Sequence, residues 1–256
     1  MLEKFVRERV NTKGIAVMGH IVCGYPSFEA NMEILEEMDK AGVDLVEMQF
    51  PFSEPIADGP LFLTANQASL DKGTKIADCF NIMKEASKRF SFKTLMMGYY
   101  NTVFKAGEVN FCERLKASGA CGLIVPDLPL EEDAGLVQAA EVNNLSLIRL
   151  VAPTNTGERI QQILEHASGF VYAVARKGVT GSKTKFAEGM EEYFQTIKKY
   201  ASVPVAVGFG ISQRADLDYL KEQGRADIAV MGTAILKTYL ESGREGLASF
   251  FKNIMG

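Results

Sequence analysis

The sequence has few of the residues from which metal centres, disulfide frameworks and histidine-based catalytic triads are built. It contains no tryptophan, four cysteines and two histidines in 256 residues. The cysteines form no CxxC pair, and His20 and His166 lie far apart along the chain. We therefore expect no disulfide, no metal site and no Ser-His-Asp triad.

Long apolar runs and clusters of like charge are also missing. No stretch approaches the roughly 18 to 20 apolar residues of a membrane span, and residues 1–14 lack the apolar core of a signal peptide. The formal net charge is −4, and the Lys and Arg residues are scattered rather than gathered in a basic stripe. We expect a cytoplasmic protein that binds neither nucleic acid nor membrane.

The chain is rich enough in apolar residues to bury a large core. Hydrophobic residues make up 47% of it and charged residues 23%, with no low-complexity tract or Ser/Gly-rich linker. A chain of 256 residues is long for one domain, but α/β barrels reach this length as a single unit. Residues 1–256 are therefore predicted to form one domain.

Short segments rich in β-branched residues alternate along the chain with longer segments of helical periodicity. Strands are predicted at 15–22, 45–48, 94–99, 122–125, 146–151, 171–175, 203–207 and 228–231. Helices are predicted at 31–40, 75–88, 111–118, 132–143, 158–166, 191–200, 214–223 and 244–254. Eight βα units favour a closed (β/α)8 barrel, the TIM barrel of the α/β class, over an open doubly wound sheet.

Two acidic residues near the second predicted strand are candidates for chemistry. Glu47 interrupts the apolar segment 45–48, where a carboxylate is costly to bury without a partner or a function. Asp58 belongs to a Pro- and Gly-rich stretch within residues 49–73, which predicts a long loop on the catalytic face. Two acids beside one pocket can divide acid and base roles. The alternatives are an outward-pointing Glu47 and an Asp58 that only stabilises its own turn.

Glycines follow the last two predicted strands. Gly208-Phe209-Gly210 comes after strand seven, and Gly232-Thr233 comes after strand eight. Many barrels bind phosphate at this place with backbone N–H groups and a short helix N-terminus. Tight βα turns are the alternative explanation for the same glycines.

Three further segments have less specific patterns. Residues 176–185 contain glycines, Thr180 and lysines after strand six, which fits either a mobile lid over a phosphorylated ligand or an ordinary solvated loop. Asp127 at the end of strand four is either a ligand residue or a turn former. His20 is as easily a pocket-wall residue as a ligand, and His166 fits a helix C-terminus, so neither receives a catalytic role.

Taken together, these segments resemble the alpha subunit of tryptophan synthase, from about residue 14 to the C-terminus. The stretch PFSEPIADGP at 51–60 is similar to the PFSDPxADGP loop of that family, and RKGVTG at 176–181 is similar to its lid. The resemblance implies retro-aldol cleavage of indole-3-glycerol phosphate to indole and glyceraldehyde 3-phosphate, without metal or organic cofactor on this chain. It also implies a beta subunit that uses pyridoxal phosphate and receives the indole, in an alpha2beta2 complex.

The resemblance further implies a role for each matching residue. Glu47 is the acid/base, Asp58 binds the indole N–H, and Tyr172 positions Glu47. The phosphate is bound by a set that combines lid residues with residues after strands seven and eight: Thr180, Gly181, Gly210, Gly232 and Thr233, of which Thr180 also helps close the lid on Asp58.

The chain departs from the family pattern at a few positions. His20 replaces an aromatic or aliphatic residue, Met48-Gln49-Phe50 replaces the commoner Leu-Gly-Val or Leu-Gly-Ile, and Glu54 replaces an Asp. Three other functions compete with the subunit of a complex. They are a lyase that releases free indole alone, an allosteric binding module that cleaves poorly, and a sugar-phosphate isomerase that shares the phosphate site.

Overall fold

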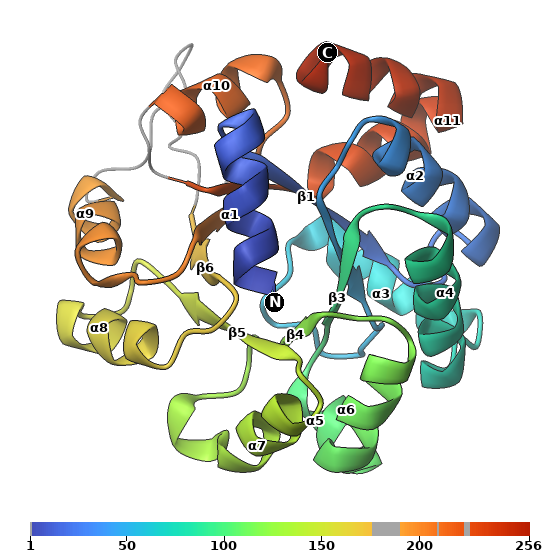
Figure 1. Ribbon diagram of the computed structural model, residues 1–256. Coiled ribbons are helices and arrows are strands. Elements are labelled where there is room, and N and C mark those ends of the chain that lie inside the picture. The colour runs from blue at the N-terminus through green and yellow to red at the C-terminus, as the bar shows by residue number, and fades with distance from the viewer. Residues whose placement is uncertain (1, 176–189, 209, 223–225) are drawn as a thin grey trace.

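The computed structural model describes residues 2–175, 190–208, 210–222 and 226–256 and has the predicted barrel architecture (Figure 1). Eight parallel strands follow one another around the barrel in chain order, and β8 pairs with β1 to close it. The strands are β1 (Ala16–Val22), β2 (Leu45–Gln49), β3 (Lys93–Met97), β4 (Gly122–Ile124), β5 (Ser146–Val151), β6 (Val171–Val174), β7 (Val205–Gly208) and β8 (Ile228–Met231). Each overlaps its predicted segment, so the fold class is confirmed.

Helices form an outer ring around the barrel in Figure 1, and α1 crosses its centre. The helices are α1 (Leu2–Lys13), α2 (Phe28–Lys40), α3 (Pro60–Asp71), α4 (Ile76–Arg89), α5 (Tyr100–Ala106), α6 (Glu108–Ala117), α7 (Ala134–Val142), α8 (Gly157–Glu165), α9 (Met190–Tyr200), α10 (Arg214–Glu222) and α11 (Thr233–Met255). Hydroxyl caps begin two of them, since Ser27 accepts from the N–H of Ala30 and Thr156 accepts from the N–H of Arg159. Every predicted helix overlaps one of these helices.

The prediction of one long loop at 49–73 was wrong in its second half. Only residues 50–59 connect β2 to a helix, because α3 begins at Pro60. Proline suits the first helical position, where its missing N–H has no intrahelical partner. The apolar side chains of Phe62 and Ala65 then pack against Val22 and Leu236, which holds the helix on the barrel. The turn-forming stretch therefore ends at Gly59, and Pro60 is already the first residue of the helix.

Two other helical regions were not predicted. α1 precedes the barrel and α5 follows β3. α11 begins at Thr233, ahead of the predicted 244–254 segment, and bends at Gly243, where φ is +62°. Such a φ suits glycine, which has no Cβ to clash.

The core has an inner and an outer layer. Side chains that alternate along each strand point either into the barrel or toward the helices. Met18, Leu45 and Ile228 belong to the inner layer, which also contains Leu2 and Val6 of α1. α1 therefore closes the end of the barrel at which the strands begin, and it crosses the centre of Figure 1. The opposite end, where the strands finish, is the one that bears the pocket.

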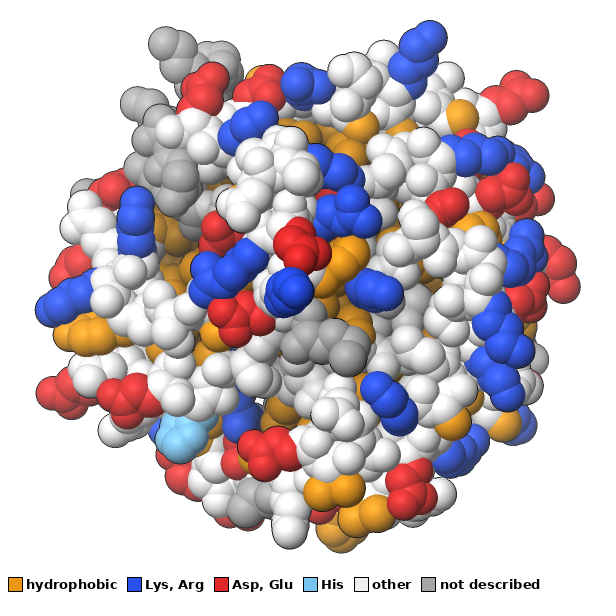
Figure 2. Space-filling model, in the orientation of Figure 1, with side chains coloured by type: hydrophobic (Ala, Val, Ile, Leu, Met, Phe, Trp, Pro, Cys, Tyr) orange, Lys and Arg blue, Asp and Glu red, His pale blue; other side chains and the backbone are white. Residues whose placement is uncertain are grey.

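No helix among the described residues is long and apolar enough to span a membrane. Figure 2 shows Lys, Arg, Asp and Glu side chains interspersed over the face on which α1 lies, without a large area of one sign. The described residues of this face therefore form no basic stripe of the kind that binds a phosphate backbone.

Candidate active site

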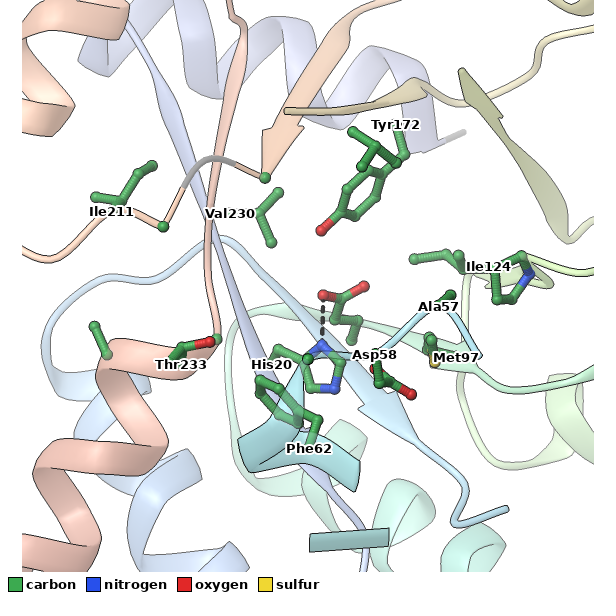
Figure 3. A pocket seen from close by; sticks show the side chains of 18 of the residues that line it. His20, Ala57, Asp58, Phe62, Met97, Ile124, Tyr172, Ile211, Val230 and Thr233 are labelled. Carbon is green, nitrogen blue, oxygen red and sulfur yellow. Dashed lines mark hydrogen bonds and ion pairs between the residues drawn. The ribbon is translucent and has the colours of Figure 1, made fainter. Parts of the chain in front are cut away.

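A pocket of about 450 Å³ lies at the carboxyl ends of the strands (Figure 3). This is the face on which barrel enzymes place their catalytic residues. Its apolar walls include Met97, Ile124, Leu150 and Val230, and its polar lining includes His20, Glu47, Asp58, Tyr172, Ser212, Thr233 and Lys237. An apolar cavity with a few convergent polar groups has the character of a small-molecule site.

Glu47 points into the barrel. On β2, Leu45 belongs to the inner core layer and Val46 and Met48 to the outer layer, so the alternation places Glu47 on the inner face. Its side chain lines the pocket although the residue is only 2% exposed. The alternative of an outward-pointing Glu47 is therefore wrong.

His20 is the immediate partner of Glu47. The two residues pair in register between β1 and β2, and His20 Nδ1 lies 2.7 Å from Glu47 Oε1, the dashed line in Figure 3. The ring of His20 packs against Phe62 of α3, with 4.4 Å between ring centroids. His20 is thus a pocket-wall residue, one of the two roles left open by the sequence, and it holds a hydrogen bond to the candidate catalytic acid.

Gln49 connects this pair to the second acid. Its Oε1 lies 2.9 Å from His20 Nε2, and its Nε2 donates to Asp58 Oδ2 over 2.7 Å. Sequence reasoning named Gln49 only as a departure from a family pattern. The signal that could have found it is the strand period of two, because Gln49 must share the inner face with Glu47.

Tyr99 holds Asp58 from the other side. Its hydroxyl donates to Asp58 Oδ2 over 2.9 Å and accepts from the N–H of Ala57 over 3.0 Å. Burial and the neighbouring Asp58 charge raise the pKa of Tyr99 well above its usual value, so the phenol remains a donor. Asp58 therefore does more than stabilise its own turn.

The loop that carries Asp58 is anchored to α3 and to the end of β3. Asn66 accepts the N–H of Phe52 over 3.0 Å and donates to the carbonyl of Phe62 over 2.8 Å. Phe52 stacks on Tyr99, with 5.1 Å between centroids. The loop that carries Asp58 is thus held in place by side chains of regular structure, not by its own residues alone.

Tyr172 of β6 enters the pocket from the opposite wall, and Figure 3 shows its hydroxyl directed toward the middle of the cavity. Desolvation and the charges of Glu47 and Asp58 raise the pKa of Tyr172 well above its ordinary value. The phenol is therefore neutral. Gly208 beside it leaves the necessary room, because a Cβ there would lie 2.7 Å from the Tyr172 hydroxyl oxygen.

Backbone groups form the remaining side of the pocket. Gly210 lines it with a φ of +71°, a conformation that favours glycine. Gly232 and Thr233 stand at the N-terminus of α11, where the first N–H groups have no intrahelical acceptor. Lys237 lies one turn further along the same helix and also lines the pocket. N–H groups at a helix N-terminus with a lysine nearby suit an anion such as phosphate.

Not every candidate residue lies at the pocket. Asp127 accepts the N–H of Tyr100 over 2.9 Å and so supports the start of α5. His166 ends α8, as expected. Thr180 and Gly181, the lid candidates, lie outside the described residues, and so does Phe209. Within the residues that the structure describes, no three His, Cys, Asp or Glu side chains are grouped as metal ligands would be.

Comparisons with known proteins give this pocket a family context. Residues 7–252 match the family model described as tryptophan synthase alpha chain. The chain is 44% identical over 254 residues to the tryptophan synthase alpha chain of Desulforapulum autotrophicum, covering 99% of this chain and 100% of the relative. It is 38% identical over 243 residues to that of Methanosarcina mazei, covering 95% and 87%.

Solved structures agree with the sequence relatives. A chain of tryptophan synthase from M. tuberculosis, in its aminoacrylate-bound form, superposes with a TM-score of 0.88 at 29% identity, covering 99% of this chain and 97% of that one. A chain of the tryptophan synthase complex from Pyrococcus furiosus superposes with a TM-score of 0.83 at 29% identity, covering 93% and 96%. The similarity therefore extends over nearly the whole barrel.

Proposed function

The chain belongs to the tryptophan synthase alpha chain family, and from that premise we propose that Glu47 and Asp58 cleave indole-3-glycerol phosphate by a retro-aldol reaction. The products are indole and glyceraldehyde 3-phosphate. The observation that carries the assignment is the pocket itself, in which both carboxylates face one apolar cavity opposite a set of backbone N–H groups. Such a cavity accommodates an indole ring between the acids and a phosphate at the far end.

Glu47 supplies the proton transfers. In its protonated form it gives a proton to C3 of the indole ring, which turns the ring carbon into a leaving group. The resulting carboxylate then takes the proton of the C3′ hydroxyl while the C3–C3′ bond breaks. The bonding electron pair returns to the ring, C3′ becomes the aldehyde carbon, and Glu47 is protonated again. No oxidant, reductant or metal is needed for this balance.

Asp58 stabilises the charge that forms between these two proton transfers. Protonation at C3 makes the ring nitrogen positive, and a fixed carboxylate beside the N–H favours that state in a dry pocket. Gln49 and Tyr99 both donate to Oδ2, over 2.7 and 2.9 Å, which fixes the orientation of the carboxylate. Its negative charge is therefore already in place before the reaction begins.

The phosphate binds on the opposite side of the pocket. Gly210, Gly232 and Thr233 offer backbone N–H groups and one hydroxyl, and the family resemblance adds Thr180 and Gly181. Tyr172 positions Glu47 from the far wall. Binding the phosphate far from the reacting carbon orients the substrate, so that the ring meets Glu47 and Asp58 together.

A beta subunit completes the biosynthetic function. We infer that this chain passes indole to that subunit in an alpha2beta2 complex in the cytoplasm, and that pyridoxal phosphate is bound by the beta subunit alone. The relatives from M. tuberculosis and P. furiosus support this, because they are described as tryptophan synthase and as a tryptophan synthase complex. The alternative, a solitary lyase, would cleave indole-3-glycerol phosphate fast without a beta subunit.

Release of glyceraldehyde 3-phosphate from indole-3-glycerol phosphate tests the proposal. The purified chain is assayed alone and with a tryptophan synthase beta subunit, and Glu47→Gln is the inactive control. We expect cleavage that the beta subunit accelerates strongly. Fast release that the partner does not change would identify a solitary lyase. No release under either condition would overturn the proposed reaction.

A further inference from the structure

A continuous series of hydrogen bonds links the two acids through His20 and Gln49, neither of which exchanges a proton with substrate in the proposed reaction. It runs from Glu47 to His20 over 2.7 Å, from His20 to Gln49 over 2.9 Å, and from Gln49 to Asp58 over 2.7 Å. His20 and Gln49 are only 7% and 0% exposed. Two buried polar residues that bind each other, one of which also binds Glu47 and the other Asp58, call for a common explanation.

The direction of each hydrogen bond in this series can be deduced by starting from Asp58. The Asp58 carboxylate only accepts, so the Gln49 amide must turn its N–H₂ group toward Asp58 and its oxygen toward His20. An amide oxygen also only accepts, so Nε2 of His20 must carry a proton. Nδ1 therefore faces Glu47 Oε1, and one proton lies between these two atoms.

This constraint ties the protonation of His20 to that of Glu47. If Nδ1 is protonated, His20 is an imidazolium and Glu47 is a carboxylate. If Nδ1 is bare, His20 is neutral and Glu47 must donate its own O–H. In either form the pair holds a single proton in the 2.7 Å contact. The first form suits a general base at Glu47 and the second a general acid.

We propose that His20 is a positioning residue that shares one proton with Glu47, and that Gln49 fixes the direction of that sharing by anchoring His20 to Asp58. The proposal rests on the assignment of Glu47 as the acid/base. His20 does not transfer a proton to substrate, since both ring nitrogens are engaged. In the form with neutral His20, Nδ1 accepts the O–H of protonated Glu47 and so directs that proton, which leaves the contact when Glu47 gives it to the ring carbon and returns when Glu47 takes the hydroxyl proton.

The surroundings of His20 favour this role. Glu47 of β2 and Asp58 of the following loop are the charged groups acting on it, while α3 presents the Phe62 ring and Gly232 approaches from the start of α11. Burial lowers the pKa of His20, but the charges of Glu47 and Asp58 and the hydrogen bonds to Glu47 and Gln49 outweigh it. The pKa is therefore raised above its ordinary value of 6.5.

Nitrogen NMR of histidine tests the shared proton without any assay of activity. The chain has only two histidines, so ¹⁵N-histidine labelling gives two residues to resolve, and His166→Gln assigns them. For His20 we expect Nε2 to stay protonated throughout the titration while Nδ1 changes, with a midpoint above pH 6.5. In Glu47→Gln the midpoint falls by at least about one unit, because the partner charge is gone and burial remains. An Nε2 that loses its proton, or an unchanged midpoint in Glu47→Gln, would overturn the proposal.

The pH dependence of cleavage is the second test, and it compares two substitutions of His20. Phenylalanine fills the space as an aromatic residue, and asparagine keeps a donor near the position of Nδ1 without a proton to share. Both variants are expected to lose roughly 10- to 100-fold in kcat, within the range of a proton-transfer contribution. Their alkaline limb moves at least about one unit to lower pH, because the imidazole whose raised pKa keeps the shared proton in the contact is gone.

The controls separate this proposal from the assigned reaction. His166→Gln leaves the rate and the profile unchanged, since His166 lies at the end of α8, away from the pocket. A packing role for His20 predicts that Phe, which fills the same space against Phe62, keeps the rate and the limb, whereas the smaller Asn lowers the rate without moving the limb. That pattern would sink the shared proton while leaving the lyase intact. Absence of cleavage in the unaltered chain would instead remove the proposed reaction, whereas the NMR result would still stand.

Discussion

Around the pocket, the side built by β1, β2 and the end of β3 consists of buried polar side chains, whereas the side built after β7 and β8 consists of glycines and backbone. On the first side, hydrogen bonds of 2.7 to 2.9 Å join Glu47, His20, Gln49, Asp58 and Tyr99. On the second, Gly210 and Gly232 offer main-chain groups, and Gly208 leaves the space that Tyr172 needs.

The difference follows from what each side must do. A proton-transfer group needs a fixed position and a controlled charge, and only neighbouring side chains on rigid strands can supply both. An anion needs several N–H donors at close range, and a Cβ would stand in its way. Substitutions on the first side are therefore expected to act on turnover, and substitutions on the second on binding.

The largest effect is expected for Glu47→Gln. The amide keeps the shape of the side chain and a hydrogen-bonding group for His20, but it cannot give or take a proton. We expect kcat for glyceraldehyde 3-phosphate release to fall by at least about 10³-fold, while substrate binding by calorimetry stays within a few-fold. Turnover like that of the unaltered chain would remove Glu47 from the chemistry and with it the contrast between the two sides.

The second largest effect is expected for Asp58→Asn. Gln49 and Tyr99 both donate to Oδ2, so the Asn oxygen takes that place and its N–H₂ group meets the indole N–H as donor against donor. Loss of the charge beside the positive ring should lower kcat/KM roughly 10²- to 10³-fold. A loss of only twofold in a steady-state assay would mean that the loop is merely structural.

The barrel and the glycine side were largely predictable from the sequence, because both depend on local signals. Strand and helix periods are read within one segment, and Gly210 and Gly232 follow strands whose order alone places them on one face. Glu47 was detectable for the same reason, as a polar residue inside an apolar strand. The direction of its side chain, into the barrel, follows from the alternation of inner and outer side chains along β2.

The hydrogen-bond chain on the acid side was not predicted, because its members are brought together by register. His20 meets Glu47 across 27 residues of sequence, and Tyr99 meets Asp58 across 41. Nothing in a single segment specifies which residue of β1 stands beside Glu47. α3 was missed for a different reason, because Gly59 and Pro60 favour turns and helix starts alike.

A smaller effect, on the other side of the pocket, is expected for Thr233→Ala. The variant loses one hydroxyl donor at the N-terminus of α11 but keeps the backbone N–H groups. KM should rise roughly tenfold with kcat little changed, which is the cost of one hydrogen bond to a charged group. Thr233→Ser is the matched control and should stay close to the unaltered chain. A fall in kcat with constant KM would show that the two sides are not separable in function.

The smallest effect is expected for Tyr99→Phe, which tests whether support of Asp58 belongs to the chemical side. The ring keeps its stacking on Phe52, but Asp58 keeps only Gln49 of the two donors that the described residues give it, and the N–H of Ala57 loses its acceptor. One such bond is worth about 1 kcal/mol, so kcat should fall roughly fivefold with KM nearly constant. Tyr100→Phe is the control, because the Tyr100 hydroxyl bonds Glu108 and neither residue lines the pocket. Equal losses in the two variants would mean that Tyr99 acts on stability alone, and a change confined to KM would place Asp58 among the binding groups rather than with Glu47.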